Sequence, residues 1–228
     1  MSISGIVLGT RGQGKSTLAK SVVKRYHTAI FYFDPNVQYY SPLTFSDPQQ
    51  MGELLAREHP AHFEIVFRPR AGQIDDDFSE FVEAIRGAGM VDNFGLVIDE
   101  ASILQSPYAI NAELEWSIRQ APQSGRLSAA GQEFYGVTVI QTSHRPIDYH
   151  GDVRSLVSDW WIFETRFKND RKWILENLPA DLAAEVSEAC NDLKRFQCIH
   201  VWFENGRGRF SVWRRPERWR VAITAANR

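Results

Sequence analysis

A glycine-rich stretch near the start of the chain constrains the fold more than any other feature. Residues 9–16 read GTRGQGKS: a glycine, four residues, a second glycine, a lysine and a serine. In this P-loop pattern the glycines let backbone N–H groups converge on phosphate oxygens, the lysine reaches the outer phosphates, and the hydroxyl is placed to ligate Mg²⁺. An apolar run precedes the stretch and an apolar-faced helix pattern follows it, which is the strand–loop–helix context that the motif requires. The predicted nucleotide-binding residues are Gly9, Thr10, Arg11, Gly12, Gln13, Gly14, Lys15, Ser16 and Thr17.

A second motif is an apolar strand that ends in two acids. Residues 95–98 read GLVI and are followed by Asp99 and Glu100. In P-loop enzymes an aspartate in this position holds Mg²⁺, and a glutamate after it polarises the attacking water. The two motifs together predict ATP and Mg²⁺ as ligands, with Ser16 and Asp99 at the metal, Lys15 on the phosphates and Glu100 as the catalytic base.

A third set of polar residues follows the apolar strand pattern of residues 136–141. A polar side chain at the end of a strand beside the nucleotide strand can contact the terminal phosphate or the water, and Gln141 and His144 both qualify. Arg119 and Arg126 are candidates for a positive charge offered to the phosphate of a neighbouring subunit, because such a group must project from a surface loop or a helix end.

Strand and helix patterns alternate along the chain, which predicts an α/β fold with a mostly parallel central sheet flanked by helices. Residues 198–204 and 207–213 flank Asn205-Gly206, a strong hairpin signal, and predict a C-terminal β-hairpin. We expect one domain over residues 1–213 and a basic tail over residues 214–228. The other expected strands are 29–33, 63–67 and 158–164, and the other expected helices are 51–58, 76–85, 112–120, 170–178 and 182–193.

Composition bounds the remaining possibilities. The 228 residues suit one domain with a substantial core, and no apolar run approaches the roughly 20 residues that cross a bilayer. Cys190 and Cys198 are too few for a disulfide framework. The net charge of −2 does not decide nucleic-acid binding, which depends on local charge, and residues 205–228 carry seven arginines against one acid.

Two local features leave alternatives open. The aromatic residues Trp202, Phe210, Trp213 and Trp219 lie among the C-terminal arginines and are compatible with base stacking or with an edge hairpin over a core. Residues 75–77 are three aspartates at a predicted helix start. We interpret them as facing the helix dipole rather than as a metal site.

The three motifs together resemble the FtsK–HerA superfamily of RecA-like DNA-pumping ATPases. The resemblance lies in the P-loop, in LVIDE at residues 96–100 and in TSHRP at residues 142–146. A short chain of this kind is most similar to the genome-packaging ATPases of tailless, membrane-containing double-stranded DNA viruses. The family's string typically reads Thr-Gln-Arg-Pro, so His144 stands where its sensor glutamine is expected. We favour Gln141 slightly, because an amide contacts phosphate at any pH whereas imidazole changes charge near neutrality.

The resemblance implies a RecA-like P-loop NTPase that forms a homo-oligomer, a hexameric ring, with ATP between subunits. Arg126 lies where this family tends to carry the arginine that completes a neighbour's site, and it ranks above Arg119. Double-stranded DNA is the expected partner and would be held through its backbone. The other expected partner is the viral capsid or its portal vertex. We expect no transmembrane segment, and a location in the host cytoplasm or on the virion at a packaging vertex.

Three other functions remain as alternatives. A small-molecule or nucleotide kinase of the P-loop class would not need Glu100. A filamentous-phage-type assembly ATPase normally carries a membrane helix. A nucleotide-gated interaction module without catalysis would not need the combination of Lys15, Asp99 and Glu100.

Overall fold

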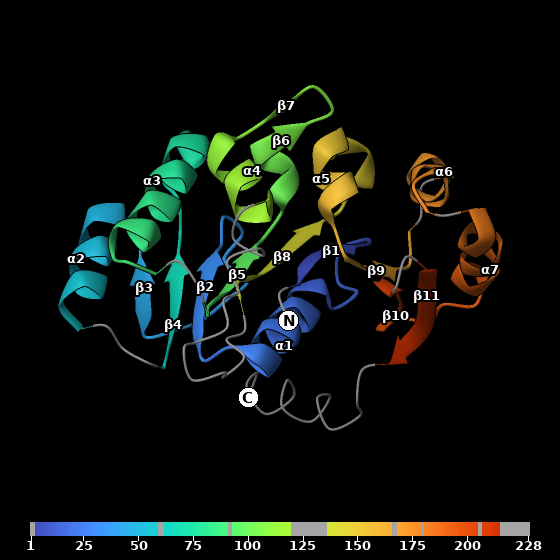
Figure 1. Ribbon diagram of the computed structural model, residues 1–228, viewed down its shortest axis with the longest axis horizontal. Coiled ribbons are helices and arrows are strands. Elements are labelled where there is room, and N and C mark those ends of the chain that lie inside the picture. The colour runs from blue at the N-terminus through green and yellow to red at the C-terminus, as the bar shows by residue number, and fades with distance from the viewer. Residues whose placement is uncertain are drawn as a thin grey trace.

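A nine-stranded sheet forms the centre of the molecule (Figure 1). The computed structural model describes residues 3–58, 62–90, 93–119, 136–165, 168–178, 180–204 and 207–214. The strand order is β11-β10-β9-β1-β8-β5-β2-β4-β3; the strands from β9 to β3 pair in parallel, and β10 and β11 are antiparallel. The predicted mostly parallel α/β fold with a C-terminal hairpin is confirmed. The strands are β1 (Ser4–Leu8), β2 (Ala29–Phe33), β3 (Leu43–Phe45), β4 (Phe63–Phe67), β5 (Gly95–Ile98), β8 (Thr138–Ser143), β9 (Asp159–Phe163), β10 (Gln197–Glu204) and β11 (Arg207–Arg214).

Helices cover both faces of the sheet. The first helix packs on one face and the other helices pack on the opposite face, as the two separate hydrophobic clusters show (Figure 1). The helices are α1 (Lys15–Tyr26), α2 (Pro48–Glu58), α3 (Ile74–Gly87), α4 (Ala112–Arg119), α5 (Gly151–Leu156), α6 (Lys168–Glu176) and α7 (Ala180–Asn191), with 3-10 turns η1 (Ala101–Leu104) and η3 (Pro146–Asp148). No described helix has the length and apolar character needed to cross a membrane.

The central strands are apolar on both sides because both of their faces are covered. In β1 the side chains of Ile6 and Leu8 belong to one hydrophobic cluster and that of Val7 belongs to the other. The same alternation separates Phe31 and Phe33 from their neighbours in β2. These strands could be predicted from the sequence because each is a continuous apolar run.

The carboxyl ends of three neighbouring parallel strands lie at one edge of the sheet. β1 pairs with β8 from Ser4↔Val139 to Leu8↔Ser143, and β5 pairs with β8 up to Ile98↔Gln141. Since parallel strands end at the same edge, the residues after β1, β5 and β8 meet there. These residues are the P-loop, the acidic pair and the segment that begins at His144.

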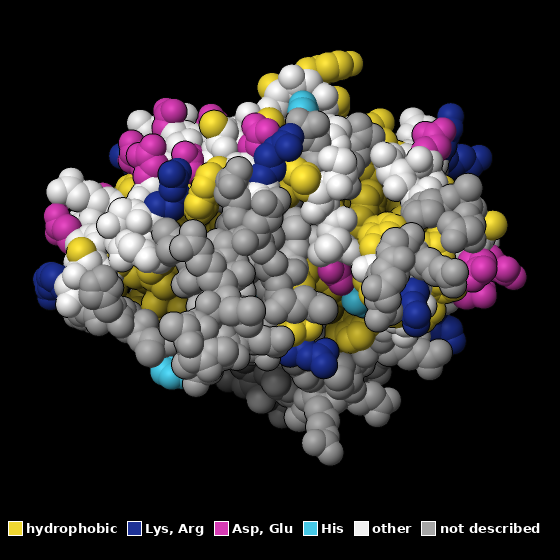
Figure 2. All heavy atoms as spheres, in the orientation of Figure 1, with side chains coloured by type: hydrophobic (Ala, Val, Ile, Leu, Met, Phe, Trp, Pro, Cys, Tyr) yellow, Lys and Arg dark blue, Asp and Glu magenta, His cyan; other side chains and the backbone are white. Residues whose placement is uncertain are grey.

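A small hairpin projects near this edge of the molecule. β6 (Gln105–Ser106) and β7 (Ala109–Ile110) pair antiparallel, and Tyr108 between them is 93% exposed. Figure 2 shows hydrophobic side chains projecting above the region that Figure 1 labels β6 and β7. An exposed aromatic ring on a projecting turn is available to a partner.

Three local features differ from the sequence expectations. α2 begins at Pro48 rather than 51, because Asp47 caps it by accepting a hydrogen bond from Gln49 N at 2.9 Å and proline suits a first turn. β8 runs to Ser143, two positions beyond the expected end, since its ladder with β1 continues. Asp77 lies in the first turn of α3 but is not exposed to solvent: its buried carboxylate pairs with Arg70.

Candidate nucleotide-binding site

The P-loop has the backbone that its glycines allow. Gly9, Gly12 and Gly14 have φ angles of 144°, 79° and 99°, which side-chain-bearing residues rarely adopt. A Cβ on Gly9 would also lie 2.6 Å from Cβ of Phe163, so this position has no room for a side chain. Gly14 is the N-cap of α1, whose first turn contains no acidic residue. The positive end of the helix therefore faces the loop without a compensating charge.

The end of β9 braces the loop from outside. Thr10 N donates to Glu164 O at 3.2 Å, and Gln13 Nε2 donates to the Glu164 carboxylate at 2.8 Å. Gln13 is buried and its side chain does not line the cavity above the loop, whereas Thr10 does. Gln13 thus supports the loop, and the sequence pattern alone did not separate this role from ligand contact.

Lys15 lies inside the site with its ammonium group held by the loop itself. Nζ donates to Gly9 O at 2.8 Å and to Thr10 O at 3.2 Å, and lies 2.9 Å from Nδ1 of His144. Burial lowers the pKa of Lys15 to about 8, and the nearby carboxylates of Glu100 and Asp99 oppose that shift. An anionic ligand would supply the counter-charge that this buried ammonium lacks.

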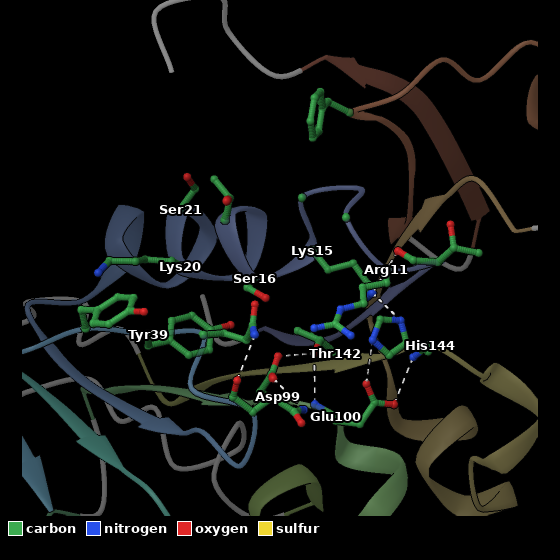
Figure 3. A pocket seen from close by; sticks show the side chains of 18 of the residues that line it. Arg11, Lys15, Ser16, Lys20, Ser21, Tyr39, Asp99, Glu100, Thr142 and His144 are labelled. Atoms are coloured by element: carbon green, nitrogen blue, oxygen red, sulfur yellow. Dashed lines mark hydrogen bonds and ion pairs between the residues drawn. The ribbon is translucent and has the colours of Figure 1, made fainter. Parts of the chain in front are cut away.

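Asp99 is only 5% exposed and is held by two side chains. Its carboxylate accepts hydrogen bonds from Thr142 Oγ1 at 2.9 Å and from Asn36 Nδ2 at 3.2 Å. Burial raises the pKa of Asp99, the two hydrogen bonds oppose the rise, and Asp34 and Glu100 add to it. Figure 3 shows Ser16 and Asp99 facing the same space.

Glu100 is fixed in an unusual backbone conformation. Its φ is 51°, in the left-handed region, and its N–H donates to Thr142 Oγ1 at 3.1 Å. Oε1 accepts hydrogen bonds from Ser102 Oγ at 2.8 Å and from His144 N at 3.2 Å, and Oε2 lies 3.3 Å from His144 Nε2. The carboxylate is therefore oriented from two sides, by the turn after β5 and by the end of β8. Figure 3 shows the contacts between Glu100 and His144.

His144 and Gln141 occupy different places. His144 lines the cavity and contacts both Lys15 and Glu100, as described above. Gln141 is fully buried, accepts a hydrogen bond from Gln105 Nε2 at 3.3 Å and does not line the cavity. Successive side chains of a strand point to opposite faces, and Thr142 takes the cavity side. The strand end thus places His144, and not Gln141, at the cavity, while the choice of phosphate sensor between the two stays a prediction.

These residues surround one large cavity at the carboxyl edge of the sheet. Its volume is about 1220 Å³. The cavity is lined by residues of the P-loop, of the acidic pair and of the segment after β8. The separate sequence motifs therefore form a single site. The predicted residues that line it are Thr10, Arg11, Gly12, Gly14, Lys15, Ser16, Thr17, Asp99, Glu100 and His144.

Comparison with known proteins bears on the fold. No protein-family model and no curated protein matches the sequence. Among solved structures, the genome-packaging NTPase B204 of Sulfolobus turreted icosahedral virus 2 in complex with sulfate aligns over 94% of this chain and 96% of its own, with a TM-score of 0.68 and 17% identity. This chain therefore shares the fold of B204. The same protein in complex with ATP-gammaS aligns over 92% and 96% at TM-score 0.67 and 18% identity. B204 described as the DNA-packaging ATPase of Sulfolobus turreted icosahedral virus aligns over 91% and 96% at 0.65 and 18%.

The residues around the cavity fit Mg²⁺. A divalent cation beside Asp99 would stabilise the charged form of a carboxylate that burial disfavours. Among the described residues no cluster of three or more His, Cys, Asp or Glu side chains could hold a metal unaided. Mg²⁺ is commonly bound by one or two protein groups together with water and phosphate oxygens, and Ser16 and Asp99, which face the same space, are two such groups.

Of the two arginine candidates, only Arg119 belongs to the described residues. Arg126 lies outside the described residues, as do residues 215–228 of the basic tail. Arg119 ends α4, where its Nε donates to Glu115 Oε1 at 2.7 Å, and it does not line the cavity. A role in another subunit's site stays a prediction for both.

Several cavity residues were missed from the sequence. Asn36 lies after β2 and bonds Asp99, and Thr142 links Asp99 to Glu100; neither belongs to the P-loop or the acidic pair. Arg145 also lines the cavity. Arg195 and Phe196 reach it from the segment before β10, about 180 residues from the P-loop, and no local pattern marks them.

Proposed function

We propose that this protein is an ATP-hydrolysing motor that translocates double-stranded DNA and packages a viral genome into a preformed capsid. The observation that carries the proposal is the convergence of Lys15, Asp99, Glu100 and His144 on one cavity of a packaging-NTPase fold. The family resemblance of the motifs and the similarity in fold to B204, a DNA-packaging ATPase, support the DNA-coupled part.

The geometry supports a direct hydrolysis at the terminal phosphate. The triphosphate would lie along the P-loop, with Lys15 transferring its hydrogen bonds from the Gly9 and Thr10 carbonyls to phosphate oxygens. Ser16 and Asp99 would hold Mg²⁺, which neutralises charge on the phosphate oxygens. Glu100 would accept a proton from water as the water oxygen attacks the γ-phosphorus and ADP leaves. ATP and water are thus converted to ADP and phosphate.

His144 is proposed as the sensor of the terminal phosphate. It already contacts both the phosphate-binding Lys15 and the base Glu100, so replacement of a triphosphate by a diphosphate changes the partners available to it. Its backbone continues into residues 145–150, where His150 N donates to Gln105 Oε1 at 3.0 Å. This contact connects the strand end to the segment that leads into β6.

The assembly is proposed to be a hexameric ring around duplex DNA. ATP would lie between subunits, with Arg126 of one subunit, or Arg119 in second place, completing the site of the next. Residues 68–73 and 104–111 are proposed to line the pore, and the exposed Tyr108 supports the second segment. The motor would act at the capsid or its portal vertex in the host cytoplasm.

ATP turnover with and without duplex DNA tests the proposal. Turnover that rises with double-stranded DNA, and that loses this stimulation steeply as salt increases, is the expected result. The Glu100→Gln variant should keep ATP binding and lose turnover by about 100-fold or more, since the amide cannot accept the proton. Phosphate transfer to a nucleoside monophosphate without DNA stimulation would instead identify a kinase.

A further inference from the structure

A turn beside the P-loop carries an aromatic residue in a conformation that usually belongs to glycine. Residues 194–197 connect α7 to β10, and Gln197 N donates to Lys194 O at 2.9 Å while Lys194 N donates to Gln197 Oε1 at 3.1 Å. Within this turn Phe196 has a φ of 66°. The left-handed region is disfavoured for a bulky residue, because its Cβ crowds the following carbonyl oxygen. Backbone strain of this kind persists only where the surrounding structure holds it, and it is concentrated at ligand-binding sites.

Phe196 lies against the nucleotide-binding loop. A Cβ built on Gly14 would be 3.5 Å from Cδ1 of Phe196, which is van der Waals contact. Arg195 and Phe196 both line the cavity, and the guanidinium carbon of Arg195 is 4.7 Å from the centre of the Phe196 ring. The turn therefore brings a flat aromatic group and a cation to the rim of the site, beside the N-cap of α1.

The strand order gives the direction in which a bound nucleotide extends. Glu100 follows β5 and His144 follows β8, so the terminal phosphate belongs on the β8–β5 side of β1. The turn 194–197 precedes β10, which lies on the opposite side of β1, beyond β9. A triphosphate whose last phosphate meets Glu100 directs its nucleoside toward Phe196.

Two other aromatic residues line the cavity and are less suitable. Tyr39 is 2% exposed and stacks on Tyr32 with ring centres 4.5 Å apart, so its ring has no open surface. Tyr40 is 74% exposed, but it follows β2, which lies beyond β5 on the side of the acidic pair. Tyr40 therefore lies past the phosphate end of the site.

We propose that Arg195 and Phe196 form the platform for the nucleoside, with the guanidinium over one face of the Phe196 ring and the base stacked on the other face. The inference rests on the proposed nucleotide-binding function. Stacking on an aromatic ring accepts every base, because each base has a π-face. The ligand class is therefore a nucleoside triphosphate, preferred over an inorganic polyphosphate but with little discrimination between bases by this contact.

Two probes separate the platform from the phosphate site. ATPγS carries the base, and inorganic tripolyphosphate carries the phosphates alone; calorimetry with Mg²⁺ gives a Kd for each. Phe196→Gly removes the ring and suits the positive φ, so the turn should persist. It should weaken ATPγS binding about tenfold or more and leave tripolyphosphate binding unchanged. Phe196→Trp should restore ATPγS binding, and Tyr40→Ala, the matched control, should change neither Kd.

Each contrary result has a definite meaning. If Phe196→Gly weakens the binding of both probes equally, the ring has a structural role; if the binding of both is unchanged, the ring has no role. Either result contradicts the platform but leaves the proposed nucleotide-binding function standing. Selective loss in Tyr40→Ala places the base at the other end of the cavity and also overturns it. If the wild-type protein binds neither probe, the proposed nucleotide-binding function fails together with the platform. If Phe196→Gly does not fold, the Kd values of the two probes are compared between Phe196→Leu, which lacks the aromatic ring, and Phe196→Trp, which keeps one.

Discussion

Glu100 and His144 show how individual residues specialise this site. The strained backbone of Glu100 turns its carboxylate toward the end of β8, where the backbone N–H of His144 and the hydroxyl of Ser102 bind it. A left-handed non-glycine residue persists only where its surroundings hold it. Three hydrogen bonds to the carboxylate, from Ser102, Ser143 and His144 N, and the contact with His144 Nε2 do so here, which leaves the carboxylate pre-oriented for one geometry of water.

The placement of His144 and Gln141 predicts opposite outcomes for their substitution. His144→Ala should reduce ATP turnover about 10- to 100-fold, because it removes contacts to Lys15 and Glu100. Gln141→Leu should leave turnover near wild type, since Gln141 is buried away from the cavity and its Nε2 has no hydrogen-bond partner among the described residues. Steady-state kinetics on both folded variants decides, and loss of turnover in Gln141→Leu alone would restore Gln141 as the sensor.

At the scale of elements, the loop and the helix after it are positioned by contacts remote from any ligand. β9 fixes the outside of the P-loop through Glu164, and the C-terminal end of α1 is fixed through His27. His27 is buried beside β8, with Nε2 2.8 Å from Thr138 Oγ1. Both ends of the loop–helix unit are thus attached to strands of the sheet.

Alanine substitutions at Gly9 and Gly12 are predicted to lower the stability of the protein by different amounts. Gly9→Ala places a Cβ against Phe163 and forces an unfavourable φ, so it should lower the free energy of unfolding by about 2 kcal/mol or more. Gly12→Ala meets no atom within 4 Å and should lower it by about 1–2 kcal/mol through its φ alone. Denaturant unfolding measures both, and a larger loss in Gly12→Ala contradicts the packing role of Gly9.

His27 predicts an acid-dependent loss of stability. Burial lowers the pKa of His27 to about 4, so between pH 6.5 and 4 the unfolded chain binds a proton that the folded chain does not. The free energy of unfolding should therefore fall as pH drops through this window, by up to about 1.4 kcal/mol per pH unit from this group. The His27→Gln variant should lack this part of the pH dependence. The His62→Gln variant, changed at an exposed histidine, should keep it. Identical pH profiles for wild type and His27→Gln would exclude the effect.

The sequence predicted those parts of the molecule that have a local signature. The P-loop, the acidic pair and the strands between them follow from apolar runs and from glycine, lysine and carboxylate chemistry, and the sheet confirms their shared edge. Whether the Gln141 side chain points toward the cavity or away from it depends on how β8 pairs with β1. The local sequence does not specify that pairing. Asn36, Arg195 and Phe196 come from distant segments, so their presence at the cavity depends on the assembled sheet order.

At the scale of the whole assembly, the proposed ring requires that one subunit complete the site of another. Glu100→Gln subunits lack the base but keep the arginine, and Arg126→Ala subunits have the reverse composition. Each variant alone should be nearly inactive. In a random equal mixture, about a quarter of the head-to-tail interfaces join an intact Glu100 to an intact Arg126 of the neighbour, and DNA-stimulated turnover should reappear at those interfaces.

Arg119 supplies the matched control for this complementation. Arg119 pairs with Glu115 within α4, so Arg119→Ala alone should keep most of the turnover. If Arg119→Ala is inactive and is rescued by Glu100→Gln subunits while Arg126→Ala is fully active, the roles of the two arginines are exchanged. If neither mixture regains activity although both variants assemble with wild-type subunits, the arginine acts within its own subunit. The shared-site ring would then lose its support, because each subunit would contain all the groups that hydrolysis needs.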